Sequence, residues 1–115
     1  MAGNDKLKMK NLVEQYYQGN FQIVIDHLKD NVKWTSHKMA NVQLESKQEV
    51  VDFLNSVPVG RFTFKHTKYI IDDDNVVIEG VCSYTGKDGS PVKNFYCDIF
   101  TFHNNEIEKV SAYFV

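Results

Sequence analysis

The order of the secondary-structure patterns constrains the fold of this chain most, because helical spacing ends before residue 58 and strand patterns alone follow it. The expected strands, rich in β-branched and aromatic residues, are residues 61–71, 76–85, 92–103 and 106–114. Only the short turn sequences DDDN, GKDGSP and NN separate them, so we expect antiparallel neighbours. A chain whose helices precede its strands is predicted to be α+β, with a curved sheet wrapped around three helices.

Two of the three helices are predicted near the start of the chain. Apolar residues recur at the i, i+3, i+4, i+7 spacing within residues 9–16, which predicts a helix over most of residues 5–18, closed by Gly19. The same spacing in residues 21–28 follows Asn20, a residue type that favours the N-cap. We therefore expect a second helix there.

A strand and a third helix are predicted next. Residues 32–35 alternate apolar and polar side chains, as a strand does, and residues 39–44 are expected to be irregular. Ser46 and Glu49 have the spacing of a capping box ahead of an apolar helical stripe. Pro58 is expected to end this third helix.

Length and charge exclude several classes of protein. With 115 residues the chain is predicted to form one domain, residues 1–115, large enough to bury a core without metals or disulfides. Its net charge is −2 and its thirteen Lys and Arg residues are dispersed, which argues against nucleic-acid binding. The start of the chain lacks a continuous apolar segment, so we expect no membrane association and a cytoplasmic location.

One carboxylate stands in the middle of an apolar, aromatic strand. Asp98 lies within the sequence NFYCDIFTF, and burial of an unpaired carboxylate costs several kcal/mol. Two interpretations remain open. Asp98 belongs to a functional site, or it is a structural carboxylate satisfied by Tyr16, a backbone amide or a water molecule.

The strand that carries Asp98 is apolar on both faces. The alternating sets are Tyr96, Asp98 and Phe100 on one face and Phe95, Cys97 and Ile99 on the other. If the first set covers the helices, the second needs another cover, so we expect a homodimer through the convex face of the sheet. Burial of both faces within one chain is the alternative. Cys82 and Cys97 lack CxxC spacing and are expected to be free thiols.

Two stretches of the chain, YYQGNFQIVIDHLKDNVKW and CDIFTFHNNEIEKVSAYF, carry a family resemblance. Together with the element order they resemble the nuclear transport factor 2-like superfamily, and most closely its SnoaL-like and ketosteroid-isomerase-like members. The resemblance implies a cone-shaped, curved, mixed antiparallel sheet around three N-terminal helices, with a central pocket. It also implies that Asp98 lies where ketosteroid isomerases hold the protonated aspartic acid of their oxyanion hole. Ser36 and Leu12 stand where those enzymes have the proton-moving carboxylate and the tyrosine, so steroid isomerisation by that mechanism is not expected.

The resemblance also implies which side chains line the pocket. With Asp98 facing the helices, Tyr96 and Phe100 share its face, and the preceding strand is expected to add Val81. His66 is predicted to approach Asp98 and to form an acid–base pair with it; the alternative is an ordinary polar residue near a strand end. The other expected ligand-binding residues are Tyr16, Trp34, Phe53, Phe62, Phe64, Val110 and Phe114.

Three functions remain open for such a pocket. The first is a cofactor-independent isomerase, cyclase or lyase that acts on an apolar carbonyl compound through Asp98. The second is noncatalytic binding of a small apolar molecule, which needs one polar anchor and no proton shuttle. The third is a protein-interaction domain. The histidines show no HxH or HExxH spacing and no glycine-rich phosphate loop follows a strand, so no metal or cofactor is expected.

Overall fold

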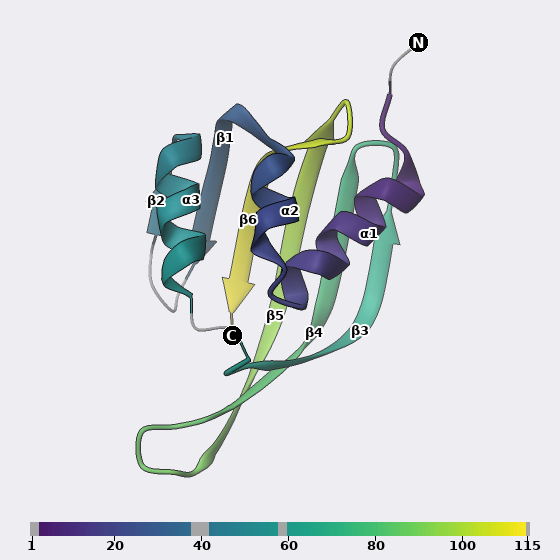
Figure 1. The fold of residues 1–115 in the computed structure, drawn as a ribbon. Helices are drawn as coiled ribbons and strands as arrows, with labels where there is room; N and C mark the ends of the chain where they lie inside the picture. The colour runs from purple at the N-terminus through teal and green to yellow at the C-terminus, as the bar shows by residue number, and fades with distance from the viewer. Residues whose placement is uncertain (1–2, 38–41, 58–59, 115) are drawn as a thin grey trace.

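Six strands form one curved sheet in the computed structural model, which describes residues 3–37, 42–57 and 60–114. The strands are β1 (Leu28–His37), β2 (Val42–Leu44), β3 (Thr63–Ile71), β4 (Asn75–Thr85), β5 (Pro91–His103) and β6 (Glu106–Phe114). Their order across the sheet is β2-β1-β6-β5-β4-β3 (Figure 1). The four strands expected after residue 61 are therefore confirmed as antiparallel neighbours.

The first and last strands of the chain lie side by side in the sheet. β1 pairs with β6 in parallel and with β2 antiparallel, which makes the sheet mixed. Residues 42–44, expected to be irregular, form the edge strand β2, and residues 39–41 lie outside the described residues. The turn between β5 and β6 holds Asn104 and Asn105 at positive φ, as a tight hairpin turn requires.

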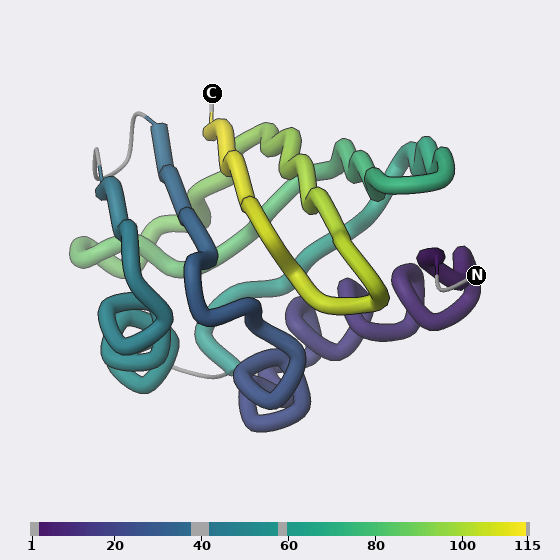
Figure 2. The backbone as a smooth tube through the Cα atoms, turned by 90° about the horizontal axis from the view of Figure 1, so that it is seen from above, coloured from purple at the N-terminus to yellow at the C-terminus, as the bar shows by residue number. Residues whose placement is uncertain are grey.

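Three helices cover the concave face of the sheet (Figure 2). They are α1 (Lys6–Tyr17), α2 (Phe21–Asp26) and α3 (Lys47–Ser56). The capping box of α3 is confirmed, since the Ser46 hydroxyl accepts a hydrogen bond from the Glu49 amide at 3.2 Å and donates one to its carboxylate at 3.1 Å. Pro58, the expected end of this helix, lies outside the described residues.

The prediction that the second helix reaches Leu28 is wrong. α2 ends at Asp26, and Leu28 begins β1, where it pairs with Ile107 of β6. The Ile107 amide donates to the His27 carbonyl at 2.7 Å, so contact with β6 holds Leu28 in the sheet.

No helix within the described residues is long and apolar enough to cross a membrane.

The hydrophobic core lies between the helices and the concave face of the sheet. Its largest fully buried side chains are Trp34, Phe100, Met9, Leu28, Leu54, Ile78 and Ile107. The convex face is different, because Phe95 is 66 % exposed and Cys97 and Ile99 are only partly buried. One chain therefore does not bury both faces of β5, and the homodimer stays a prediction. Both cysteines are free thiols, as expected.

The chain ahead of α1 joins two turns of the sheet. The Asn4 side-chain amide donates to the carbonyl oxygens of Asp73 and Phe102, each at 3.1 Å. Its carbonyl oxygen accepts from the Asn105 amide at 2.8 Å, and the Asp5 amide donates to the Asn105 side chain at 2.7 Å. These hydrogen bonds hold the β3–β4 and β5–β6 turns together beside the start of α1.

Candidate functional site

Asp98 lies on the concave face of β5, as predicted, and is only 5 % exposed. Cross-strand pairing puts it between Ile78 of β4 and Ala112 of β6, and Ala112 in turn pairs with Ser36 of β1. Residues paired across neighbouring strands lie on the same face. The carboxylate therefore stands in a row of small and apolar side chains in the middle of the sheet.

The hydrogen-bond partner of Asp98 is Tyr17, at the end of α1. The Tyr17 hydroxyl donates a hydrogen bond to Asp98 Oδ2. Asp98 Oδ1 is buried and has no hydrogen-bond partner among the described residues. Tyr17 thus holds one carboxylate oxygen, and the other makes no hydrogen bond of normal geometry within the described residues.

Burial controls the protonation of this pair. Desolvation raises the pKa of Asp98 to about 7, although the hydrogen bond from Tyr17 and a weaker interaction with the Tyr113 backbone amide act in the opposite direction. Burial and the nearby carboxylate raise the pKa values of Tyr16 and Tyr17 well above their usual range. Near neutral pH, Tyr17 is a hydrogen-bond donor and Asp98 is poised between its two protonation states.

Asp98 and Tyr17 form part of the wall of a cavity of about 340 Å³ between the sheet and the helices. The other lining residues are Tyr16, Trp34, Ser36, Val42, Phe53, Ser56, Val57, Phe62, Phe64, Cys82, Tyr84, Ala112 and Phe114. Most of this wall is aromatic or aliphatic. Among the described lining residues Asp98 is the one carboxyl group, and none is a histidine.

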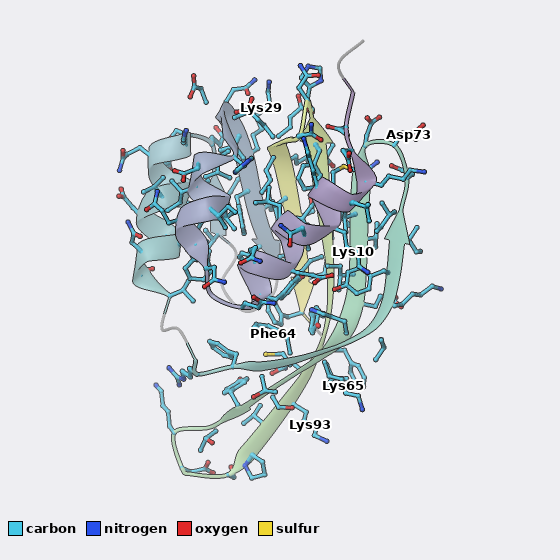
Figure 3. All side chains as sticks on the ribbon, turned by 45° about the vertical axis from the view of Figure 1, so that its right-hand side comes forward. Lys10, Lys29, Phe64, Lys65, Asp73 and Lys93 are labelled. Atoms are coloured by element: carbon cyan, nitrogen blue, oxygen red, sulfur yellow. The ribbon has the colours of Figure 1, made fainter. Side chains whose placement is uncertain are left out.

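Six of the ten side chains expected to bind a ligand line this cavity. They are Tyr16, Trp34, Phe53, Phe62, Phe64 and Phe114. Phe64 lies on the inner side of β3, whereas its neighbour Lys65 points outward (Figure 3). Tyr96, Phe100 and Val110 are buried on the concave side but lie outside the lining. Their roles in binding stay predictions.

Val81 lies on the other face of the sheet, so its expected place in the pocket is wrong. It pairs with Phe95, an exposed residue of the convex face, while Cys82 and Tyr84 line the cavity. The cause is the register of the β4–β5 hairpin, which pairs Asp98 with the even-numbered Ile78. A shift of one residue in such a pairing moves every side chain to the opposite face.

His66 lies close to this site but not in the cavity. Its Nδ1 is hydrogen-bonded to the Tyr96 hydroxyl at 2.6 Å, and its ring packs edge-on against Tyr17 with 4.5 Å between centroids. His66 lines a separate open groove between α1 and β3, together with Glu14 and Tyr69. The structure therefore connects His66 to Asp98 through Tyr17, where a direct approach was expected.

Tyr17 is the residue of the candidate site that the sequence analysis did not identify. It follows Val13 by four residues, so helical spacing places it on the buried side of α1 beside Tyr16. Within the described residues, no three His, Cys, Asp or Glu side chains are grouped to hold a metal ion. The lining residues that carry carboxyl, hydroxyl or thiol groups are Asp98, the tyrosines, Cys82, Ser36 and Ser56.

Comparison with known proteins agrees with this architecture. A family model described as the SnoaL-like domain matches residues 9–110. No curated protein sequence matches the chain. An NTF2-like (nuclear transport factor 2-like) protein of unknown function from Cytophaga hutchinsonii is similar in structure, with a TM-score of 0.87 and 24 % identity over 97 % of this chain and 100 % of that one.

Two solved structures of more distant proteins are also similar in fold. An epoxide hydrolase of the LEH-like type from M. tuberculosis has a TM-score of 0.75 and 18 % identity, over 97 % of this chain and 86 % of that one. A candidate SnoaL-like polyketide cyclase from Jannaschia sp. CCS1 has a TM-score of 0.77 and 12 % identity, over 97 % and 91 %. At such identities these structures support the fold and not the reaction. Since the family model matches most of its length, the chain belongs to the SnoaL-like domain family, whose fold is NTF2-like.

Proposed function

We propose that the protein binds a small, largely apolar molecule in the central cavity and that Asp98 anchors it. The observation that carries this proposal is Asp98 Oδ1, a buried carboxylate oxygen at the cavity wall with no hydrogen-bond partner among the described residues. A buried polar atom left unpaired costs about 1–3 kcal/mol, and a ligand hydroxyl or carbonyl would recover much of that cost. The aromatic wall supplies the apolar contact.

Acid–base chemistry is the finer part of the proposal. A carboxyl group whose pKa is about 7 both gives and takes a proton near neutral pH, which suits an isomerase, cyclase or lyase that needs no cofactor. Some proteins of similar fold are described as a candidate polyketide cyclase, an LEH-like epoxide hydrolase and a candidate ketosteroid isomerase. In this chain Asp98 would take a proton from the carbon beside a ligand carbonyl and return it, while Tyr17 holds the second carboxylate oxygen.

Noncatalytic binding is the second candidate, and one observation favours it. Asp98 is the one carboxyl group in the described cavity wall, and Ser36 occupies the next polar position along its cross-strand row. A serine hydroxyl without a base does not move protons near neutral pH. A carrier or sensor needs only the shape of the cavity and one anchor.

The cytoplasmic location expected from the sequence stays a prediction.

The test compares 2-naphthol, which has a hydroxyl, with naphthalene, which has none, on the wild type and Asp98→Asn. By calorimetry, we expect Asp98→Asn to weaken 2-naphthol binding about tenfold, the effect of losing a hydrogen bond to a charged group, and to leave naphthalene binding unchanged. The exposed Asp30→Asn is the matched control. Equal affinity of the wild type and Asp98→Asn for 2-naphthol would contradict the anchor, and no binding of either probe would contradict the cavity site.

A second measurement separates catalysis from binding. The ketone 2-tetralone has acidic protons beside its carbonyl, and their exchange in D₂O is followed by NMR. If Asp98 works as an acid–base group, the wild type accelerates this exchange and Asp98→Asn does not. Binding of 2-tetralone with the same exchange rate in both proteins would leave the noncatalytic function.

A further inference from the structure

A row of three residues crosses the sheet beside the Tyr17–Asp98 pair. Cross-strand pairing aligns His66 of β3 with Gly80 of β4, and Gly80 with Tyr96 of β5. Tyr96 is two residues from Asp98 on the same strand and faces the same side. The row therefore lies one step along the concave face from the candidate site.

Because Gly80 has no side chain, Tyr96 and His66 can form a hydrogen bond across β4. A Cβ atom at this position would overlap the Tyr96 hydroxyl and the backbone oxygen of Lys65. With glycine there, the Tyr96 side chain lies across β4 and its hydroxyl is hydrogen-bonded to His66 Nδ1 at 2.6 Å. Tyr96 is almost fully buried, so this hydrogen bond is shielded from water on the Tyr96 side.

His66 in turn supports one side of the Tyr17 ring. Their centroids are 4.5 Å apart in an edge-to-face arrangement, and Tyr96 and Phe64 contact the same ring at 5.8 Å and 5.1 Å. Beyond His66 lies the open groove with Glu14 and Tyr69, and the Lys10 ammonium group lies over the Tyr69 ring, 5.1 Å from its centroid. His66 thus stands between that groove and the tyrosine whose hydroxyl reaches Asp98.

We propose that His66, held by Tyr96 in the space left by Gly80, is a positioning residue that keeps the Tyr17 hydroxyl on Asp98. The inference rests on the proposed function only in taking Asp98 as the anchor of the cavity. Because the Tyr17 hydrogen bond stabilises the charged carboxylate, weakening it makes Asp98 a weaker acid. The protonation state of Asp98 then depends in part on His66, which does not line the cavity.

The test is a pH titration of the Asp98 side-chain carbon by NMR in the ligand-free full chain, with Asp98→Asn to identify its signal. Tyr17→Phe gives the largest expected rise in the pKa of Asp98. Tyr96→Phe and His66→Phe each keep a ring but lose the shared hydrogen bond, so we expect each to raise this pKa by about half a unit, a threefold change in proton affinity. The double variant should shift it no further than either single variant, since both remove the same bond.

Tyr69→Phe is the matched control, because Tyr69 also contacts the His66 ring, at 5.5 Å between centroids, and also lines the groove. It should leave the pKa of Asp98 unchanged. If His66→Phe and Tyr96→Phe lower stability but leave this pKa within a tenth of a unit, the row is merely structural and the proposal is overturned. An equal shift in Tyr69→Phe also overturns it. Because no ligand is present, the result is independent of whether the cavity binds 2-naphthol.

Discussion

At the scale of single residues, the burial that raises the pKa of Asp98 also lowers the stability of the folded protein near neutral pH. Its pKa in the folded chain is about 7, whereas the usual value is 3.8, so the folded protein holds this proton more tightly than the unfolded chain does. The contribution to stability is complete below about pH 4 and is lost as the pH rises toward 7. A shift of this size corresponds to a loss on the order of 4 kcal/mol.

Replacing Asp98 should therefore change how stability depends on pH. Asp98→Asn stays neutral, so its free energy of unfolding should rise relative to that of the wild type from pH 4 to pH 7, by roughly 4 kcal/mol in total, and the difference should then stay constant. Urea unfolding at pH 4, 5.5, 7 and 8.5 measures this difference. The exposed Asp30→Asn should follow the wild type at every pH. A constant difference between Asp98→Asn and the wild type would mean that Asp98 is a structural carboxylate with an ordinary pKa.

How well residues could be predicted depends on how far their neighbours lie along the chain. Asp98 was recognisable because its neighbours along the strand are apolar or aromatic on both faces, which makes a carboxylate unusual there whichever face meets the helices. Tyr17 needed only the spacing from Val13 along one helix. His66 was harder, since its separation from Asp98 depends on the space at Gly80 and on the path of the Tyr96 side chain, which no local pattern encodes.

At the scale of elements, local signals located most boundaries and tertiary contacts decided the exceptions. Turn sequences delimited β3 to β6 nearly as observed. Leu28 lies in β1 and not in the predicted helix because it pairs with β6. Val81 faces outward because the β4–β5 register places it opposite Phe95. Helical spacing and strand alternation say which face is apolar, but the register between strands says which face meets the helices.

The link between the two turns and α1 gives a prediction at this scale. Asn4→Ala removes the hydrogen bonds to Asp73, Phe102 and Asn105, of which the first is exposed and the other two are partly buried, so we expect a loss of about 1–2 kcal/mol in stability. Hydrogen exchange at the Asn105 amide should quicken at the same time. The control is the exposed Asn31→Ala in β1. Unchanged exchange at Asn105 in Asn4→Ala would show that the turns hold together without α1.

At the scale of the whole molecule, the convex face is the surface still without a cover. It carries Phe95 and Tyr113, 66 % and 40 % exposed, and the Tyr113 ring stacks flat on His37 at 4.4 Å between centroids. Its partly buried apolar residues include Val77, Val81, Cys97 and Ile99. We propose that a second copy of the chain covers this face, because exposed apolar residues on one face of a sheet suit a symmetric interface.

Sedimentation velocity tests this proposal. The wild type should be a dimer, and Phe95→Glu should be a monomer because it puts a charge at the centre of the interface. Leu7→Glu changes a residue that is 80 % exposed on α1, far from this face, and should leave the dimer intact. A monomeric wild type, or equal dissociation in Leu7→Glu, would contradict the interface.

The parallel pairing of β1 with β6 has a consequence for the folding of the chain during its synthesis on the ribosome. β1 leaves the exit tunnel early, but the edge that β6 covers stays open until the strand ending at Phe114 has been synthesised. Until then the row from Ser36 through Ala112 to Asp98 does not exist, and the nascent chain carries an unpaired strand edge beside exposed aromatic side chains. The cavity therefore forms only after translation has passed its last strand, and in that interval the chain presents the kind of surface that chaperones recognise.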